Sequence, residues 1–245
     1  MPATYGPYIG SGKVYMRKYG STEPLEEIGN CSVLQPGVSE NRIDQNDYTI
    51  AGGGTYASVS RIESVTFEAT LHDLNPLNLA RALFGTNTAV TGATVSNEQV
   101  VARRGGLARL AHPSPTTVSV THTSGTPTYV AGTDYEVRPE GIYVLTAGAI
   151  TDAQTIRVSY TYAAYARVEG LVAGAADYEI VFAGLNEANS NKPVIVDMWK
   201  VQLSPAEQLA LIGEEFAELT LTGRVLKDTT KTGAGISQYM RVQMQ

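Results

Sequence analysis

The stretch VSRIESVTFEATL, residues 59–71, alternates between apolar and polar side chains. The two kinds of residue take alternate positions over most of its length: Val65, Phe67, Ala69 and Leu71 against Ser64, Thr66, Glu68 and Thr70. Because successive side chains of a strand point to opposite faces, this pattern predicts a strand with one buried and one wet face. At about 3.3 Å per residue it would span about 43 Å, which is long for a globular protein. One long amphipathic strand is therefore expected at the centre of the fold.

Strand signals and a polar segment precede this strand. Residues 13–19 and 26–34 are rich in β-favouring residues and are predicted to form a first pair of strands, separated by a turn at 21–24. Residues 36–58 are polar and contain Asp44, Asp47 and the run Gly52-Gly53-Gly54. This composition predicts a long flexible hairpin or loop.

Two short helices are predicted from their capping residues. Asn75-Pro76 is typical of a helix start, and apolar residues then recur at helical spacing until Gly85. Ser204-Pro205-Ala206-Glu207 has the spacing of a capping box, with Gly213 as a terminator. The frame is therefore expected to be mainly β, a β-sandwich or partial barrel with two short α-helices. Its other predicted strands are residues 165–172, 177–185, 193–203, 215–226 and 238–244.

A block of different composition interrupts the frame at residues 112–163. It is rich in Tyr, Thr and Val, and turn signals such as Pro127 and Gly132-Thr133-Asp134 separate its short strand patterns. We interpret it as a small inserted β module, which leaves 1–111 and 164–245 as one discontinuous domain. A module of about 50 residues is near the lower limit for independent folding, so it is expected to lean on the frame.

Composition argues against several classes of function. The net charge is −6 and the pI about 5.1, so no field favours tight binding of nucleic acid or of an anionic membrane. Cys31 is the single cysteine, which excludes an intrachain disulfide and the paired cysteines of structural zinc sites. Residues 1–12 lack a basic segment followed by an apolar run, so we expect no secretion signal, and no stretch is apolar enough for a membrane anchor.

Motifs that would carry chemistry are incomplete. Gly10-Ser11-Gly12-Lys13 lacks the first glycine and the final Ser or Thr of a phosphate-binding loop, and Gly52-Gly53-Gly54 lacks the strand-to-helix context of a dinucleotide site. The three histidines His72, His112 and His122 are scattered, and a G-x-S-x-G motif is missing. We therefore expect no enzyme, and no catalytic, cofactor or metal site.

Five patterns, in this order, resemble the major tail tube protein of long-tailed bacteriophages. They are the 59–71 strand, the helix NPLNLARALFG at 75–85, the strand start Lys192-Pro193-Val194, the capped Ser204 helix, and FAELTLTGRVLKD at 216–228. A run within the insertion, YVAGTDYEV at 129–137 with 141–143 and 158–162, is similar to a β module that recurs in phage tail components. Minimal tube subunits lack such an insertion.

The resemblance implies a structural virion protein. Its subunits would form hexameric rings whose inner sheets join into a β-barrel around a lumen, with the rings stacked through a long loop. The implied partners are further copies of the chain, a tape measure protein, a tail terminator and distal tail or baseplate proteins. Genomic DNA would pass through the tube during ejection without specific binding, and no membrane is involved. Assembly would occur in the host cytoplasm, and the protein would reside in the virion tail.

Three expectations follow for individual residues. The lumen wall is expected to be polar and net negative, because cations there would bind DNA phosphates and slow the DNA; the candidate wall residues are Glu63, Glu68, Asp177 and Glu179. The candidate contact between rings is the loop at 35–58, with Asp44, Asp47, Gly52, Gly53 and Gly54. The insertion is expected on the outside of the tube, where it leaves the channel open.

Two other functions stay open on the sequence. The 14 tyrosines and the insertion are compatible with a carbohydrate-binding or adhesive β protein of a virion or cell surface. The candidates for an adhesive face are Tyr129, Tyr135, Tyr143, Tyr160 and Tyr162, although tyrosines in strands more often pack half-buried across a sheet. A tube subunit of a bacterial secretion system would have a related architecture. Sequence separates it poorly from a phage tube, although the insertion favours the phage.

Overall fold

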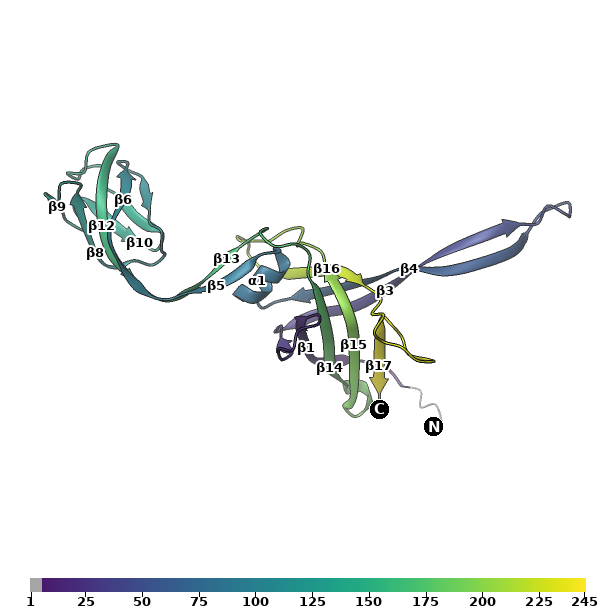
Figure 1. The fold of residues 1–245 in the computed structure, drawn as a ribbon. Helices are drawn as coiled ribbons and strands as arrows, with labels where there is room; N and C mark the ends of the chain where they lie inside the picture. Colours follow the sequence, from purple (N-terminus) through teal and green to yellow (C-terminus); the bar gives the residue numbers. More distant parts are fainter. Residues whose placement is uncertain (1–5) are drawn as a thin grey trace. The chain divides into compact units, whose positions relative to one another are not determined.

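A computed structural model describes residues 6–245, which fall into two compact units. Unit 1 comprises residues 6–87 and Val168–Gln245, and unit 2 comprises Thr88–Arg167. Strands dominate both, so the expected mainly-β class is confirmed (Figure 1). The expectation of no secretion signal concerns residues 1–12, of which 1–5 lie outside the described range.

Unit 1 is built on one eight-stranded antiparallel sheet of order β2-β1-β14-β15-β16-β4-β3, with β17 also paired to β15. The bounds of its elements are β1 Gly10–Lys18, β2 Glu26–Glu27, β3 Cys31–Asn46, β4 Thr55–Leu71, α1 Pro76–Ala82, β14 Asp177–Asn186, the 3-10 turn η1 Glu187–Asn189, β15 Lys192–Leu203, β16 Leu219–Val225 and β17 Met240–Met244. The first half of β15 pairs with β17 and its last residues pair with β16. The sheet therefore branches along β15.

The predicted long strand is confirmed as β4. Val65, Phe67, Ala69 and Leu71 are all buried in the core of unit 1, while Thr66 between them is exposed. Thr70, predicted on the wet face, is buried. Other strands of the same sheet complete this core with Met16, Ile180, Met198, Leu219 and Leu221. The alternation in the sequence thus marks which face of β4 is removed from water.

The first predicted helix is confirmed as α1. Its N-cap Asn75 accepts a hydrogen bond from the backbone N–H of Asn78 at 2.8 Å, and Pro76 occupies the first turn. Ala82 near its end is buried in the core of unit 1. Capping and packing therefore agree at this site.

The second predicted helix, at residues 204–213, is wrong. Between β15 and β16 the described backbone forms no helix, and β16 starts at Leu219 instead of within 215–218. Ala206 and Leu209 pack against the core, but Leu211, Ile212 and Phe216 are 81%, 97% and 95% exposed. A helix this short depends on burial of its apolar side, and most of that side is uncovered here.

Unit 2 contains two small sheets, β6-β12-β8-β9 and β10-β11-β7. The bounds are β5 Thr86–Val90, β6 Ala93–Ala102, β7 Leu107–Arg109, β8 Thr116–His122, β9 Thr128–Tyr129, β10 Tyr135–Arg138, β11 Gly141–Val144, β12 Gln154–Tyr162 and β13 Tyr165–Glu169. β5 and β13, along which the chain enters and leaves the unit, pair as a two-stranded sheet.

The predicted boundaries of the inserted module, 112 and 163, are too narrow. The unit begins at Thr88 and ends at Arg167. β6 and β7 precede residue 112, yet they pair with β12 and β11. Ala102 and Leu110 also belong to the core of this unit. Long-range strand pairing, which local composition does not record, therefore sets the boundary.

Asp134 ties two loops of unit 2 together. Its carboxylate is buried and accepts hydrogen bonds from the backbone N–H groups of Ala149 and Val130, each at 2.7 Å. These bonds, with that of Ala149 the larger influence, lower the pKa of Asp134. The stabilisation is therefore present above the carboxyl's unfolded pKa, near 3.9, and is lost as pH falls through the lower folded value.

Replacing Asp134 by alanine is expected to destabilise unit 2 by about 2–3 kcal/mol, because two buried N–H groups lose a charged acceptor. Hydrogen exchange of the full chain at pH 7 measures this as faster exchange in peptides of unit 2 than in wild type. Glu140→Ala, at an exposed position of the same unit, is the control. Equal exchange in the Asp134→Ala and Glu140→Ala chains would contradict the assigned role.

Candidate assembly surfaces

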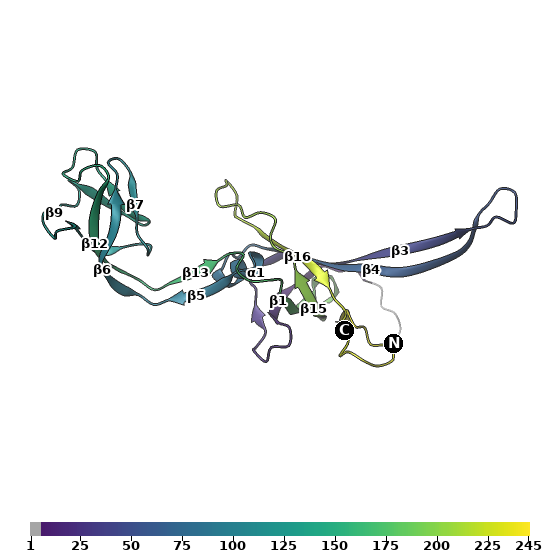
Figure 2. The same cartoon turned by 45° about the horizontal axis from the view of Figure 1, so that its top comes forward.

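A long hairpin projects from the sheet of unit 1. β3 and β4 pair from Cys31↔Leu71 out to Asn46↔Thr55, and residues 47–54 close the turn. We call residues 39–64 the arm; almost all its side chains are exposed on both faces. Figures 1 and 2 both show the two strands side by side, extending beyond the other strands of unit 1.

The predicted contact residues lie together at the outer end of this arm. The irregular part is shorter than expected, because much of 36–58 belongs to the paired strands and 47–54 forms the tip. Gly52, Gly53 and Gly54 all take positive φ angles in the tip, which glycine adopts with little strain. Asp47 accepts bonds from the N–H and hydroxyl of Thr49, at 2.7 and 2.6 Å, and these bonds lower its pKa.

Asp44 lies on the strand just below the tip. The Arg42 guanidinium donates to its carboxylate at 3.0 Å, and bonding to Ser58 and then to Arg42 lowers the pKa of Asp44. Arg42 also donates to the Ser58 hydroxyl at 2.7 Å. These three polar side chains of the arm therefore have hydrogen-bond partners within the hairpin itself.

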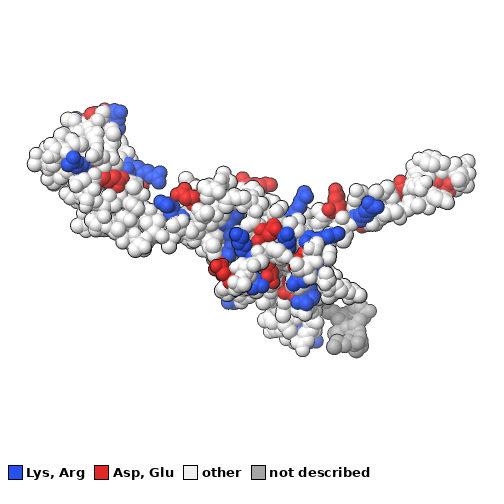
Figure 3. Space-filling model, viewed as in Figure 1, with Lys and Arg blue, Asp and Glu red and all other residues white. Residues whose placement is uncertain are grey.

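Large apolar side chains are exposed along the arm, a feature that the sequence reasoning missed. They are Ile43, Tyr48, Ile50, Tyr56, Val59 and Ile62, with Tyr48 at 85% exposure. Ile43 and Val59 form a cross-strand pair. A signal was present, because large apolar residues recur in a segment otherwise described as polar. Figure 3 shows that the outer end of the arm carries few charged side chains on the face in view.

Exposure of this kind points to burial in an assembly. A two-stranded ribbon is marginally stable in water on its own, and contiguous exposed apolar surface marks interaction sites. The arm therefore offers both backbone and apolar side chains to a partner.

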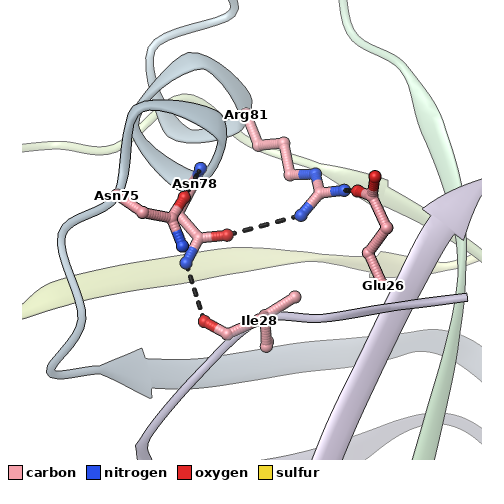
Figure 4. Close-up of polar contacts among 5 residues, drawn as sticks. All are labelled: Glu26, Ile28, Asn75, Asn78 and Arg81. Carbon is pink, nitrogen blue, oxygen red and sulfur yellow. Dashed lines mark hydrogen bonds and ion pairs between the residues drawn. The ribbon is translucent and has the colours of Figure 1, made fainter. Parts of the chain in front are cut away.

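Contacts of α1 hold the segment that leads into β3 (Figure 4). The amide of Asn78, which is buried, donates to the Ile28 carbonyl at 2.7 Å, in the link between β2 and β3. Arg81 is also buried; it donates to Asn78 at 3.3 Å and pairs with Glu26 of β2 at 2.6 Å. These bonds hold the start of β3 against the helix.

The predicted wall residues do not form one cluster. Glu68 lies on β4, whereas Asp177 and Glu179 lie on β14, and β15 and β16 separate those strands in the sheet. All three alternate with buried or core-packed neighbours, so they occupy the face away from the core. Glu63 lies on the arm, beside an irregularity of the ladder between Ser39 and Glu40.

Cations neutralise part of this predicted wall. Glu179 pairs with Arg17 at 2.7 Å, and Asp177 pairs with Lys200 at 3.2 Å. Glu68 accepts a bond from the Gln35 amide at 2.7 Å. Each carboxylate on β14 is therefore balanced by a cation, whereas the partner of Glu68 on β4 is a neutral amide.

The histidines and the cysteine, which could take part in catalysis or metal binding, are spread over both units. His72 lies 3.6 Å from Glu218, His112 stacks on Tyr162 with ring centroids 3.7 Å apart, and His122 bonds Ser124. Burial raises the pKa of the Cys31 thiol to about 11, which disfavours the reactive thiolate. Residues 6–245 contain no group of three or more His, Cys, Asp or Glu side chains arranged to hold a metal.

Three of the five tyrosines of the candidate adhesive face are buried, while Tyr143 and Tyr162 are half-buried. Tyr129, Tyr135 and Tyr160 are buried in the core of unit 2. The hydroxyl of Tyr160 donates to Glu98 at 2.6 Å, inside the unit. These tyrosines thus serve packing.

The sequence model of a family described as "Protein of unknown function UCP028589" matches residues 7–243. This match spans both units. A comparison with curated proteins found no match. Within the described part of the chain, no helix is long and apolar enough to cross a membrane.

Proposed function

The chain belongs to this family of unknown function, and we propose that it is a structural subunit that self-assembles into the tail tube of a bacteriophage. In this proposal hexameric rings stack into a conduit through which DNA leaves the virion. The observation that carries it is the arm, a long exposed hairpin whose apolar side chains are uncovered in the single chain.

Sheet edges provide a second support. β3 is the last strand in the sheet order, so its outer edge has no partner among the described strands. β17 covers part of β15 and presents another edge. Unpaired edges are satisfied when sheets join across subunits, and closure into a barrel removes them altogether.

The polar face of the sheet suits a channel for DNA. Glu68 and Thr66 on β4 and Thr222 on β16 face away from the core. DNA is a dense polyanion, and a wall without excess cations keeps its contacts weak. We therefore assign β4 to the channel wall, with Glu63 and Glu68 as its negative residues.

The remaining assignments follow from the same proposal. Partners would be further copies of the chain, a tape measure protein, a tail terminator and distal tail or baseplate proteins. Unit 2 would lie on the outside of the tube. For the adhesive alternative, Tyr129, Tyr135 and Tyr160 are buried, which removes these three from a binding face.

Purified wild-type chain is expected to form rings or tubes with a central hole in negative-stain electron microscopy. The arm and the open edges have no other means of burial in solution, so association should rise with protein concentration. Analytical ultracentrifugation provides the second measurement. A chain that remains monomeric at high micromolar concentration, with no rings on the grid, would contradict the proposal.

A further inference from the structure

The segment between β15 and β16 is acidic and apolar at once. Residues 204–218, SPAEQLALIGEEFAE, contain four glutamates and no lysine or arginine. We call this segment the strap; in Figure 2 it leaves the sheet as a loop. Its Leu211, Ile212 and Phe216 are, with Tyr48 of the arm, the large apolar side chains more than 80% exposed among the described residues.

A groove of about 790 Å³ lies between the strap and the sheet. Thr220, Thr222 and Glu68 form its floor, and Phe216 and Leu211 lie along the strap side. Five glutamates line it, four from the strap and Glu68 from β4, with no Lys or Arg among its described lining residues. The strap side of this groove, with its four glutamates beside Leu211 and Phe216, therefore favours a partner that brings cations together with apolar side chains.

The chain carries a surface of this opposite kind. Residues 224–245, which we call the C-terminal segment, contain Arg224, Lys227, Lys231 and Arg241 against a single acid, Asp228. Lys231 and Arg241 lie over the ring of Trp199, at 4.4 and 4.9 Å from its centroid, and Arg241 also pairs with Asp197 at 2.8 Å. The apolar Ile236, Val242 and Met244 are exposed in the same segment.

The last glutamates of the strap and the basic segment flank β16. The strap runs into Leu219, where β16 starts, and the basic residues begin at Arg224, where it ends. The strand between them spans about 20 Å, at roughly 3.3 Å per residue. Beyond that end, β17 follows β15 through pairs from Met198↔Met240 to Val194↔Met244. The strap itself starts beside the other end of the strand, where the Ser204 N–H donates to the Thr222 carbonyl at 2.8 Å.

From this arrangement we propose that the strap of one copy docks on the C-terminal segment of the next copy. The contact is head to tail, because two different surfaces meet, and such contacts generate rings or open stacks. It buries Leu211, Ile212 and Phe216 and brings the glutamates opposite Arg224 and Lys227. The inference rests on the proposed self-assembly and names the surfaces through which neighbouring copies recognise each other.

Charge reversal with rescue tests the pairing. One variant carries Glu214→Lys and Glu215→Lys in the strap, and the other carries Arg224→Glu and Lys227→Glu. Each variant alone places like charges on both surfaces, so its assembly concentration is expected to rise more than about tenfold. An equimolar mixture restores opposite charges at every contact and is expected to assemble within about twofold of wild type. Light scattering and negative-stain microscopy follow both.

Matched controls separate the contact from general charge and folding effects. Glu140→Lys with Arg109→Glu reverses exposed charges in unit 2 and is expected to leave assembly unchanged. Circular dichroism melting checks that each variant is folded, and Phe216→Ser tests the apolar part without a charge change. Higher salt is expected to weaken assembly of wild type and of the mixture alike.

The outcomes distinguish this inference from the proposed function. Folded variants that assemble like wild type, or a mixture that stays dissociated, would overturn the strap contact and leave self-assembly standing. Wild-type chain that never associates would overturn both. Loss of assembly in each charge-reversed variant, with recovery of assembly in the mixture, supports the contact.

Discussion

Deletion of residues 44–54 is expected to abolish stacking of the subunits while unit 1 remains folded. The cut removes the tip of the arm with Tyr48 and Ile50, and it leaves the pair Ile43↔Val59 to close over a four-residue turn, a length that hairpins tolerate. The deleted side chains contribute nothing to the core. Negative-stain microscopy should therefore show no tubes, and the free energy of unfolding of unit 1 should change by less than about 0.5 kcal/mol.

Point variants sharpen this test. Tyr48→Lys with Ile50→Lys keeps the chain length and should reproduce the loss, since lysine at the tip opposes burial in an apolar contact. Val130→Lys, at an exposed apolar position of unit 2, is the matched control and should assemble like wild type. Tubes of normal length from the deletion or from the double variant would show that the arm does not join subunits.

Removal of unit 2 is the second change with a large expected effect. Joining Val90 to Tyr165 through a short Gly/Ser turn keeps the β5–β13 pair and removes the rest of the module. The buried clusters of the two units share no residue within the described chain, so unit 1 should keep its core. The shortened chain is expected to assemble into tubes of smaller outer diameter with an unchanged hole.

The position of the cut is part of this prediction. Replacement of residues 115–162 alone would leave β6 and β7 without β12 and β11, and their apolar faces would be exposed. Residues 88–167 expressed alone should give a folded module, measured by dispersed amide resonances and a cooperative melt. Aggregation of the shortened chain, or loss of its tubes, would show that unit 2 is needed for folding or assembly of unit 1.

Local sequence was enough to predict elements whose determinants lie within a few neighbouring residues. The alternation around Phe67 correctly assigned the buried face of β4, because strand geometry turns a period of two into two faces. Asn75 and Pro76 correctly placed the start of α1, because a cap acts within a few residues. The five residues assigned to the contact loop also lie together, since they are neighbours along one turn.

Other features depended on residues far apart in the chain. Glu98 pairs with Val158 in the β6–β12 ladder. No local pattern near residue 88, where unit 2 begins, predicts that β6 has this partner. The partners of the candidate wall residues were hidden for the same reason, because Arg17 and Glu179 belong to distant strands. The exposure of Ile43 and Val59 likewise follows from how far the hairpin extends past its sheet.

The strap shows most clearly the difference between what neighbouring residues determine and what distant residues determine. Ser204 and Glu207 have the right spacing for a capped helix, and this signal depends on neighbouring residues alone. Whether a helix forms is settled by what covers Leu211 and Ile212, and in the single chain nothing covers them. A short helix gains too little from its own hydrogen bonds to offset the entropy of ordering, so packing against distant residues decides its existence.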